Sequence, residues 1–247
     1  MRLSDPLIAP FRLIADAALP PRCPGCGAVT RADHRFCAAC WNQLRFLAPP
    51  WCASCNTPFS IDRGVDARCA ECLETPPRHA GVRAAVAYDM IPKAMALRLK
   101  YGGHLAYAET IARHMARLMP GDAEILIPVP LHARRLWGRG FNQAGEIARG
   151  LSRYAGVPLD VDSLRRVVAT PLLRGLGAKA RAEAVARAFA ISPDRRARLA
   201  DKAIVLVDDV YTSGATTGAC TLTLLRAGAR KVTILCWARV LDPAAAD

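Results

Sequence analysis

The segment that most constrains the fold is AIVLVDDVYTSGATT, residues 203–217. It begins with five apolar residues, Ala203 to Val207, a pattern typical of a strand buried on both faces of a parallel sheet. Two adjacent acids, Asp208 and Asp209, follow this strand. In open α/β sheets, ligands bind at the carboxyl ends of the strands. We therefore expect the acid pair to belong to a ligand site.

The residues after the acid pair predict a phosphate site. A loop rich in hydroxyl groups leads into an expected helix over Thr216 to Ala227. Backbone amides at a helix N-terminus bind anions, and a glycine allows the turn that gathers them. The loop residues are Thr212, Ser213, Gly214, Ala215 and Thr216. A phosphate site next to carboxylates that can bind hydroxyls or a metal ion fits a ribose 5-phosphate as the ligand. A Walker A loop is excluded, because it requires a lysine directly after its last glycine.

Eight of the ten cysteines form four C-x-x-C pairs. The pairs are Cys23/Cys26, Cys37/Cys40, Cys52/Cys55 and Cys69/Cys72. Two thiolates in one tight turn converge on a tetrahedral metal, so the pattern predicts two structural Zn²⁺ sites. Redox-active pairs and an iron–sulfur cluster fit the spacing less well. Sequential pairing is our expectation, and an interleaved arrangement satisfies the same spacing. Cys220 and Cys236 lie in helix and strand patterns and are expected to be packing residues.

Strand and helix patterns alternate through the rest of the chain, which predicts an α/β fold with a parallel sheet flanked by helices. The expected strands are residues 84–90, 124–131, 164–168 and 231–240, in addition to 203–207. Between the first two of these strands, the pattern predicts a helix, a break at Gly102–Gly103 and a second helix.

A second anion site is expected after the strand over residues 124–131. His132 to Gly140 reads as a basic loop, and Asn142 reads as the N-cap of a helix from Gln143 to Tyr154. The candidate anion ligands are Lys100, Arg134, Arg135, Arg139, Asn142 and the amides near Leu131. The alternative is a capped helix with solvated arginines.

The basic charge of the chain lies mostly in its second part. The net charge is +13, of which residues 81–247 carry 25 − 14 = +11 and residues 1–80 carry 9 − 7 = +2. A basic, arginine-rich surface suits phosphates or nucleic acid, although an ordinary solvated surface has the same composition. No stretch approaches the roughly 18 apolar residues of a membrane span. We expect a cytoplasmic protein, or one that lies peripherally at the inner membrane.

IVLVDDVYTSGATT resembles the phosphoribosyl diphosphate (PRPP) motif of type I phosphoribosyltransferases. With the zinc-ribbon pattern, LKYGG and PVPLHARRLWGRGFNQA, the chain is similar to the ComF family of competence-associated proteins, whose relatives are called amidophosphoribosyltransferase-like or GntX-like. The resemblance implies that Asp208 and Asp209 hold the ribose and a Mg²⁺ ion, and that residues 212–216 hold the 5-phosphate. It also assigns the pyrophosphate to the arginines of the basic loop.

The family resemblance further implies a role in DNA uptake, with single-stranded DNA and the uptake machinery as partners. The alternatives are a phosphoribosyltransferase of unknown acceptor and a PRPP-sensing regulator without catalysis. We expect an N-terminal helix over residues 1–20, a double zinc ribbon over 21–80 and a phosphoribosyltransferase-like domain over 81–247. The chain departs from the family pattern at Leu173 and Ala184, whereas Thr170 and Arg181 match it.

Overall fold

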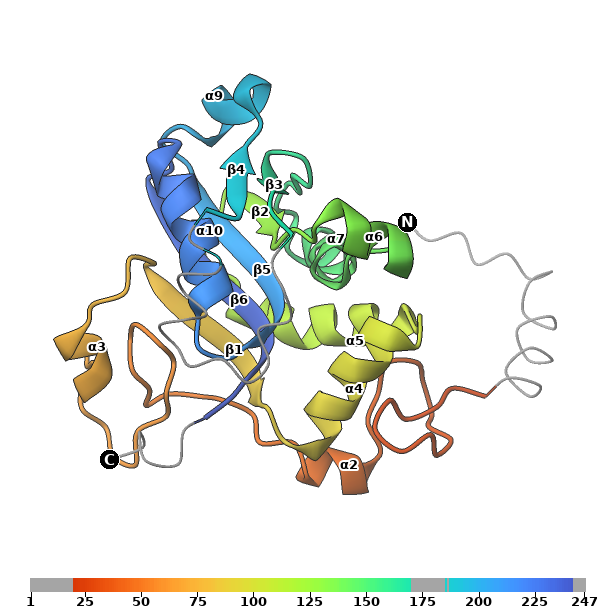
Figure 1. Cartoon of the computed structure of the whole chain (residues 1–247). Coiled ribbons are helices and arrows are strands. Elements are labelled where there is room, and N and C mark those ends of the chain that lie inside the picture. Colours follow the sequence, from red (N-terminus) through yellow and green to blue (C-terminus); the bar gives the residue numbers. More distant parts are fainter. Residues whose placement is uncertain (1–19, 170–184, 186, 242–247) are drawn as a thin grey trace, which may run out of the picture.

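A computed structural model describes residues 20–169, 185 and 187–241 of the chain (Figure 1). The expected N-terminal helix and the segment with Thr170, Leu173, Arg181 and Ala184 lie outside these residues. Among the described helices, none is long and apolar enough to cross a membrane.

The centre of the fold is a four-stranded sheet in which all neighbouring strands run parallel, as the sequence predicts. The spatial order is β1-β6-β5-β2, so β5, which carries the acid pair, is an inner strand. The strands are β1 (Gly81–Ala87), β2 (Ile125–Pro128), β5 (Ala203–Tyr211) and β6 (Lys231–Arg239). The fold class predicted from the sequence is therefore confirmed.

Helices cover both faces of this sheet and enclose two apolar cores (Figure 1). One core lies under α4 (Met90–Tyr101), α5 (Ala106–Met115) and α7 (Gln143–Ala155). The other lies under α10 (Ala215–Arg226) and α9 (Arg196–Leu199). Gly102 follows α4, so the expected break between two helices is confirmed. The shorter elements are α2 (Ala38–Asn42), α3 (Ala70–Glu74), η1 (Ala116–Leu118), α6 (Ala133–Arg139), β3 (Leu164–Arg166), β4 (Phe189–Ile191) and η2 (Pro193–Arg195).

Three sequence expectations are wrong in detail. The strand with the acid pair does not end at Val207, because Asp208 and Tyr211 still pair with β6. The basic segment after β2 is not a loop but the helix α6, whose first turn is capped by the His132 side chain. The strand at Leu164 does not join the parallel sheet. It forms a separate two-stranded antiparallel sheet with β4.

The N-terminal region covers the free edge of β1. The backbone N–H of Leu47 donates to Ala85 O (3.0 Å), and the N–H of Ala87 donates to Arg45 O (2.9 Å). Nearer the start of the strand, the N–H of Val82 donates to Ser54 O at 2.8 Å. An exposed edge strand is open to unwanted pairing. This edge is therefore closed by the cysteine-rich part of the same chain.

Candidate functional site

A cavity of about 1040 Å³ opens at the carboxyl end of β5. It is lined by Asp208, by the loop residues 212–217 and by basic residues from α4 and α6. A smaller recess of about 350 Å³ continues from it between β5, α4 and the start of α7, and Asp209 lines this recess. The structure thus gathers the acid pair, the hydroxyl-rich loop and cationic side chains around one space.

The acid pair is held by the local backbone. Asp208 Oδ1 accepts from the N–H of Asp209 at 2.9 Å, and Asp209 Oδ1 accepts from the N–H of Val210 at 3.0 Å. Lys100 Nζ lies 4.0 Å from Asp209 Oδ2. Burial raises the pKa of the Asp208 carboxyl well above its usual range, and the neighbouring charge of Asp209 adds to the rise. A cation between the two carboxylates would relieve this repulsion.

The hydroxyl-rich loop ends at the N-terminus of α10. Gly214 takes a left-handed conformation (φ 71°) and is the N-cap residue. No side chain caps this helix. The first-turn amides of an uncapped helix are free to bind an anion. Tyr211 closes the other side of the turn, because a Cβ added at Gly214 would lie 2.4 Å from its hydroxyl oxygen.

The predicted cationic residues divide into two groups. Lys100, Arg135 and Arg139 line both the cavity and the recess. The Arg139 guanidinium lies 5.5 Å from the Tyr101 ring centre, and its Nη1 is buried without a hydrogen-bond partner. Arg134 is exposed on α6 and lines neither space.

Leu131 and Asn142 line the recess but not the cavity. Asn142 is the N-cap of α7, as expected: its Oδ1 accepts from the N–H of Ala144 at 3.2 Å, and its Nδ2 donates to Val129 O at 3.0 Å. Both polar atoms of the side chain are therefore used to shape this corner of the recess.

Sequence reasoning missed two polar residues of the recess, Gln143 and Arg166. Gln143 is 3% exposed, and its Nε2 has no hydrogen-bond partner. A buried amide without a partner is costly, so the group is available for a ligand. Its place directly after the expected N-cap was the signal that could have identified it. Arg166 comes from β3, which the sequence placed in the wrong sheet, so no pattern indicated its position.

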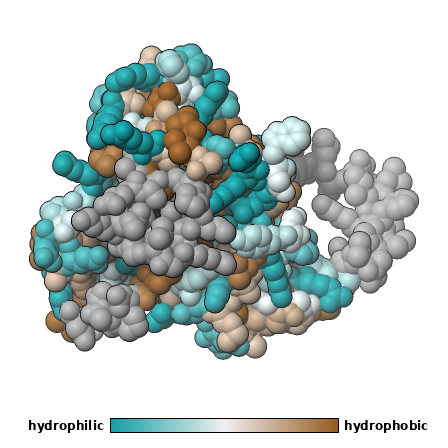
Figure 2. Space-filling view, in the orientation of Figure 1, coloured by the Kyte–Doolittle hydropathy of each residue, from teal (hydrophilic) through white to brown (hydrophobic). Residues whose placement is uncertain are grey.

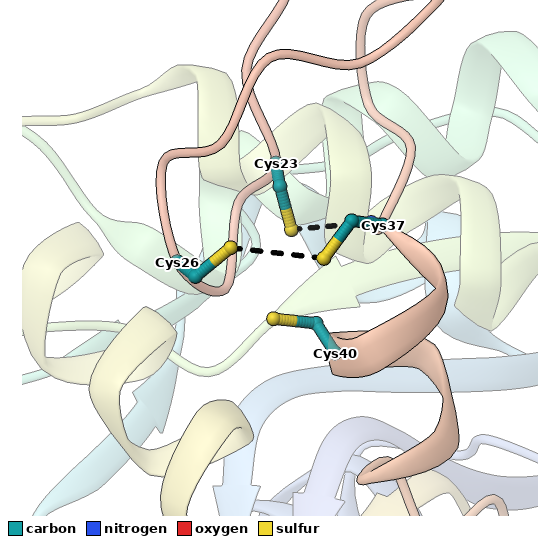
Figure 3. A group of neighbouring side chains, drawn as sticks. All are labelled: Cys23, Cys26, Cys37 and Cys40. Carbon is teal, nitrogen blue, oxygen red and sulfur yellow. Dashed lines mark hydrogen bonds between the residues drawn. The ribbon is translucent and has the colours of Figure 1, made fainter.

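The eight paired cysteines form two tetrads, in the sequential arrangement expected. In each tetrad the four Sγ atoms lie within 4.8 Å of one another. One tetrad is Cys23, Cys26, Cys37 and Cys40, and the other is Cys52, Cys55, Cys69 and Cys72. Figure 3 shows the four side chains of the first tetrad pointing toward a common centre.

The two tetrads have the same local construction. In each, the third cysteine precedes a short helix, and its backbone N–H donates to the Sγ of the first cysteine at 3.3 Å. Burial raises the pKa of Cys23 and Cys52, but backbone N–H donors outweigh it and lower each value to about 7. Thiolates in this number and geometry fit Zn²⁺. The tetrads differ in exposure: Cys26 is exposed, whereas the second tetrad is fully buried.

Comparison with known proteins agrees with this construction. The family model of the double zinc ribbon domain matches residues 14–73 of the sequence. The chain is 28% identical to competence protein F of Haemophilus influenzae over 86% of this chain and 94% of that protein. It is 27% identical to the DNA utilization protein YhgH of Escherichia coli K12, over 89% and 90% of the two chains.

Among solved structures, a glutamine PRPP amidotransferase from B. subtilis aligns with a TM-score of 0.36 and 18% identity. The alignment covers 51% of this chain and 25% of that one. The fold assignment rests on the parallel sheet order and on the double zinc ribbon of the N-terminal region.

Proposed function

We propose that this chain, a homologue of competence protein F with an N-terminal double zinc ribbon, binds a phosphorylated ribose of the PRPP type and acts in DNA uptake. The observation that carries the proposal is the placement of an acid pair, an uncapped helix N-terminus and three cations around one cavity. The names of the relatives support the role in DNA uptake.

Each part of the cavity suits one part of the ligand. The amides of residues 212–216 would hold the 5-phosphate at the start of α10. Asp208 and Asp209 would accept hydrogen bonds from the ribose hydroxyls. Arg135, Arg139 and Lys100 would hold the pyrophosphate across the recess, and Gln143 Nε2 would donate a further hydrogen bond there.

The acid pair also fits Mg²⁺, which prefers carboxylate oxygens. When bound, the ion would neutralise charge on the pyrophosphate and on the two carboxylates. Lys100 Nζ already lies near Asp209, so a lysine ammonium and a metal ion would share the neutralisation of this carboxylate. We propose that PRPP binding depends on Mg²⁺ for this reason.

Single-stranded DNA is the partner that we propose for the surface around the cavity. In the sequence, residues 134–202 carry 15 − 6 = +9 charges, and of these Arg135, Arg139 and Arg166 line the cavity or the recess in the part of the chain that the structure describes. Trp137 on α6 is 91% exposed and lies between Arg134 and Arg139, which suits a base stacked beside two phosphates. Figure 2 shows hydrophilic side chains interspersed with small apolar patches on the visible face, as expected for a polar partner rather than a large apolar one.

Calorimetry of the zinc-loaded protein tests the ligand. We expect binding of PRPP in the presence of Mg²⁺ and loss of that binding in the double variant Asp208→Asn, Asp209→Asn. Asp162→Asn is the matched control, because Asp162 is exposed and lies outside the cavity and the recess. Wild-type affinity in the double variant would show that the acid pair does not hold the ribose.

Catalysis is a second candidate function, and the size of the cavity favours it. A volume of about 1040 Å³ lies at the top of the usual range of roughly 300–1,000 Å³ for small-molecule pockets, which leaves room for a second reactant. The reaction would displace pyrophosphate from C1 of PRPP by a nitrogen nucleophile. Release of pyrophosphate that requires both PRPP and an amine would support an enzyme, whereas tight PRPP binding without turnover would support a sensor.

A further inference from the structure

Another cavity, of about 410 Å³, lies toward the amino ends of the strands, away from the acid pair. Thr233 of β6 lines it and pairs with Val205, whereas Tyr211, six residues further along β5, lines the cavity at the carboxyl end. At about 3.3 Å per residue, the two places are about 20 Å apart. We call this second space the amino-end pocket, and its lining includes Trp51, Arg83, Arg117, Lys231 and Thr233.

The amino-end pocket carries an excess of positive charge. Three cationic side chains line it, and there is no acid among the lining residues that the structure describes. Lys231 Nζ pairs with Asp122 Oδ2 at 2.6 Å, so this charge is balanced. Within the described part of the chain, neither Arg83 nor Arg117 forms an ion pair with a carboxylate. Burial lowers the pKa of Arg83, and the charge of Cys52 offsets this only in part.

Arg83 is held in place by uncharged groups. Its Nη1 donates to Ala53 O at 3.3 Å and to Val82 O at 2.7 Å. Its guanidinium also lies 5.4 Å from the centre of the Trp51 ring, which is a cation–π contact. Its Nε and Nη2 make no hydrogen bond with any residue that the structure describes. A half-buried, fixed guanidinium therefore keeps donors available for a ligand.

Arg117 approaches the same pocket from η1. Its Nη2 donates to Ala85 O at 3.2 Å, and its guanidinium lies 5.3 Å from the centre of the Phe46 ring. Guanidinium groups bind phosphate oxygens through pairs of parallel hydrogen bonds. Because both arginines are already positioned by carbonyl groups and aromatic rings, a ligand does not have to order them, which lowers the entropic cost of binding.

Thr233 adds a recessed hydroxyl to these two cations. The residue is 7% exposed, and its Oγ1 has no hydrogen-bond partner in the described part of the chain. Buried polar groups in folded proteins are nearly always hydrogen-bonded, so a nearly buried hydroxyl without a partner on the wall of a cationic pocket indicates a place for a ligand oxygen.

We propose that the amino-end pocket binds a phosphate monoester and is a ligand site separate from the cavity at the carboxyl end. Arg83 and Arg117 hold the phosphate oxygens, and the Thr233 hydroxyl donates a further hydrogen bond. A monoester suits the unbalanced charge because it carries about −1.5 to −2 charges and three strong acceptor oxygens. The volume lies within the usual range of roughly 300–1,000 Å³ for small-molecule pockets, so the phosphate can carry a sugar or a nucleoside.

Nuclear magnetic resonance of the zinc-loaded protein tests this site with inorganic phosphate and with a nucleoside monophosphate. The indole N–H of Trp51 and the backbone amide of Thr233 are the local signals, and both should shift in saturable titrations with each compound. Arg117→Gln should weaken the binding by about 10-fold or more, because it removes a charge-assisted hydrogen bond. Thr233→Val, read at the Trp51 indole, should weaken it by about 5-fold, because it removes a neutral hydrogen bond.

Arg113→Gln is the matched control. Arg113 is exposed on α5 and lies outside the pocket, and its charge acts on His114 as that of Arg117 does. An equal loss of affinity in this variant would show that only total charge matters and would overturn the proposal. The absence of saturable shifts would overturn it too, as would shifts caused by unphosphorylated oligothymidylate and by neither monoester. The amides of residues 212–216 report separately on the other cavity, so failure here is distinguishable from failure of the proposed function.

Discussion

At the scale of single residues, the buried carboxyl of Asp208 lowers the stability of the fold and contributes to the candidate binding site. Burial and the charge of Asp209 raise its pKa, so the folded chain holds a proton there more tightly than the unfolded chain does. Stability from this group is therefore present below the unfolded pKa and is lost as the pH rises through the folded pKa. At neutral pH, above the unfolded pKa, burying this carboxyl is a net cost to the fold, which a bound cation would remove.

Asp208→Asn should for this reason raise the thermal stability of the ligand-free protein at neutral pH. The amide oxygen can still accept from the N–H of Asp209, so the local backbone is kept. Each kcal/mol gained shifts the melting temperature of a chain of this size by roughly 2–4 °C. Calorimetric melting at several pH values measures this, and the gain should shrink as the pH falls. A variant that melts below the wild type at neutral pH would contradict the raised pKa.

At the scale of elements, the sequence predicts the apolar strands, but it does not predict where the strands end or how the polar segments after them fold. Runs such as Ala203–Val207 show a buried strand directly. Strand pairing then extends β5 to Tyr211, because β6 offers backbone partners beyond the apolar run. The helix α6 was missed because it has no buried residue and hence no apolar periodicity. Gln143 became visible only through burial without a partner, which depends on the packed structure.

The helix α6 carries a prediction about DNA. Replacing Arg134, Arg135 and Arg139 by alanine removes up to three phosphate contacts. The slope of log affinity for single-stranded DNA against log salt should flatten by up to about two units, at roughly 0.7 per contact. Fluorescence titrations over a range of salt concentrations measure this slope. Alanine at the exposed Arg31, Arg35 and Arg68 is the control, and an equal change there would mean that only total charge matters.

The packing of α5 against the first ribbon carries a prediction about pH. His114 lies among the rings of Phe36, Trp41, Phe46 and Trp237, and burial, followed by the charges of Arg117 and Arg113, lowers its pKa to about 4. The unfolded chain therefore binds a proton first, and stability is lost as the pH falls from about 6.5 to about 4.

His114→Phe should remove this part of the acid sensitivity. Each pKa unit corresponds to about 1.4 kcal/mol, and partial exposure reduces the effect. We therefore expect the wild type to lose about 1 kcal/mol more of its free energy of unfolding than the variant loses across that range. Urea unfolding at pH 7 and pH 5 with excess zinc gives the two differences. Parallel loss of stability in both proteins would assign the acid sensitivity to the thiolates instead.

At the scale of the whole molecule, the zinc ribbons are part of the sheet's construction. We expected a ribbon unit over residues 21–80 and a separate unit over 81–247, and β1 does begin at Gly81. Four hydrogen bonds nevertheless join the two parts along the edge of β1, including one from the Ala84 N–H to Asn56 Oδ1 at 2.7 Å. Leu47 and Trp51 also pack in the core under α10. The division into domains stays a prediction, and the contacts favour shared stability.

Removal of zinc should consequently destabilise the sheet as well as the ribbons. Four edge hydrogen bonds at a net 0.5–1.5 kcal/mol each correspond to about 2–6 kcal/mol, or a melting temperature lower by at least about 4 °C. Cys72→Ser should lower it more than Cys26→Ser, because the second ribbon supplies Ser54 and Asn56 to the edge of β1. Melting followed by hydrogen exchange in β1 and β6 measures the effect. If zinc removal releases residues 21–80 while these strands keep their wild-type protection, the ribbons are an appended module, and the edge contacts add little to the stability of the sheet.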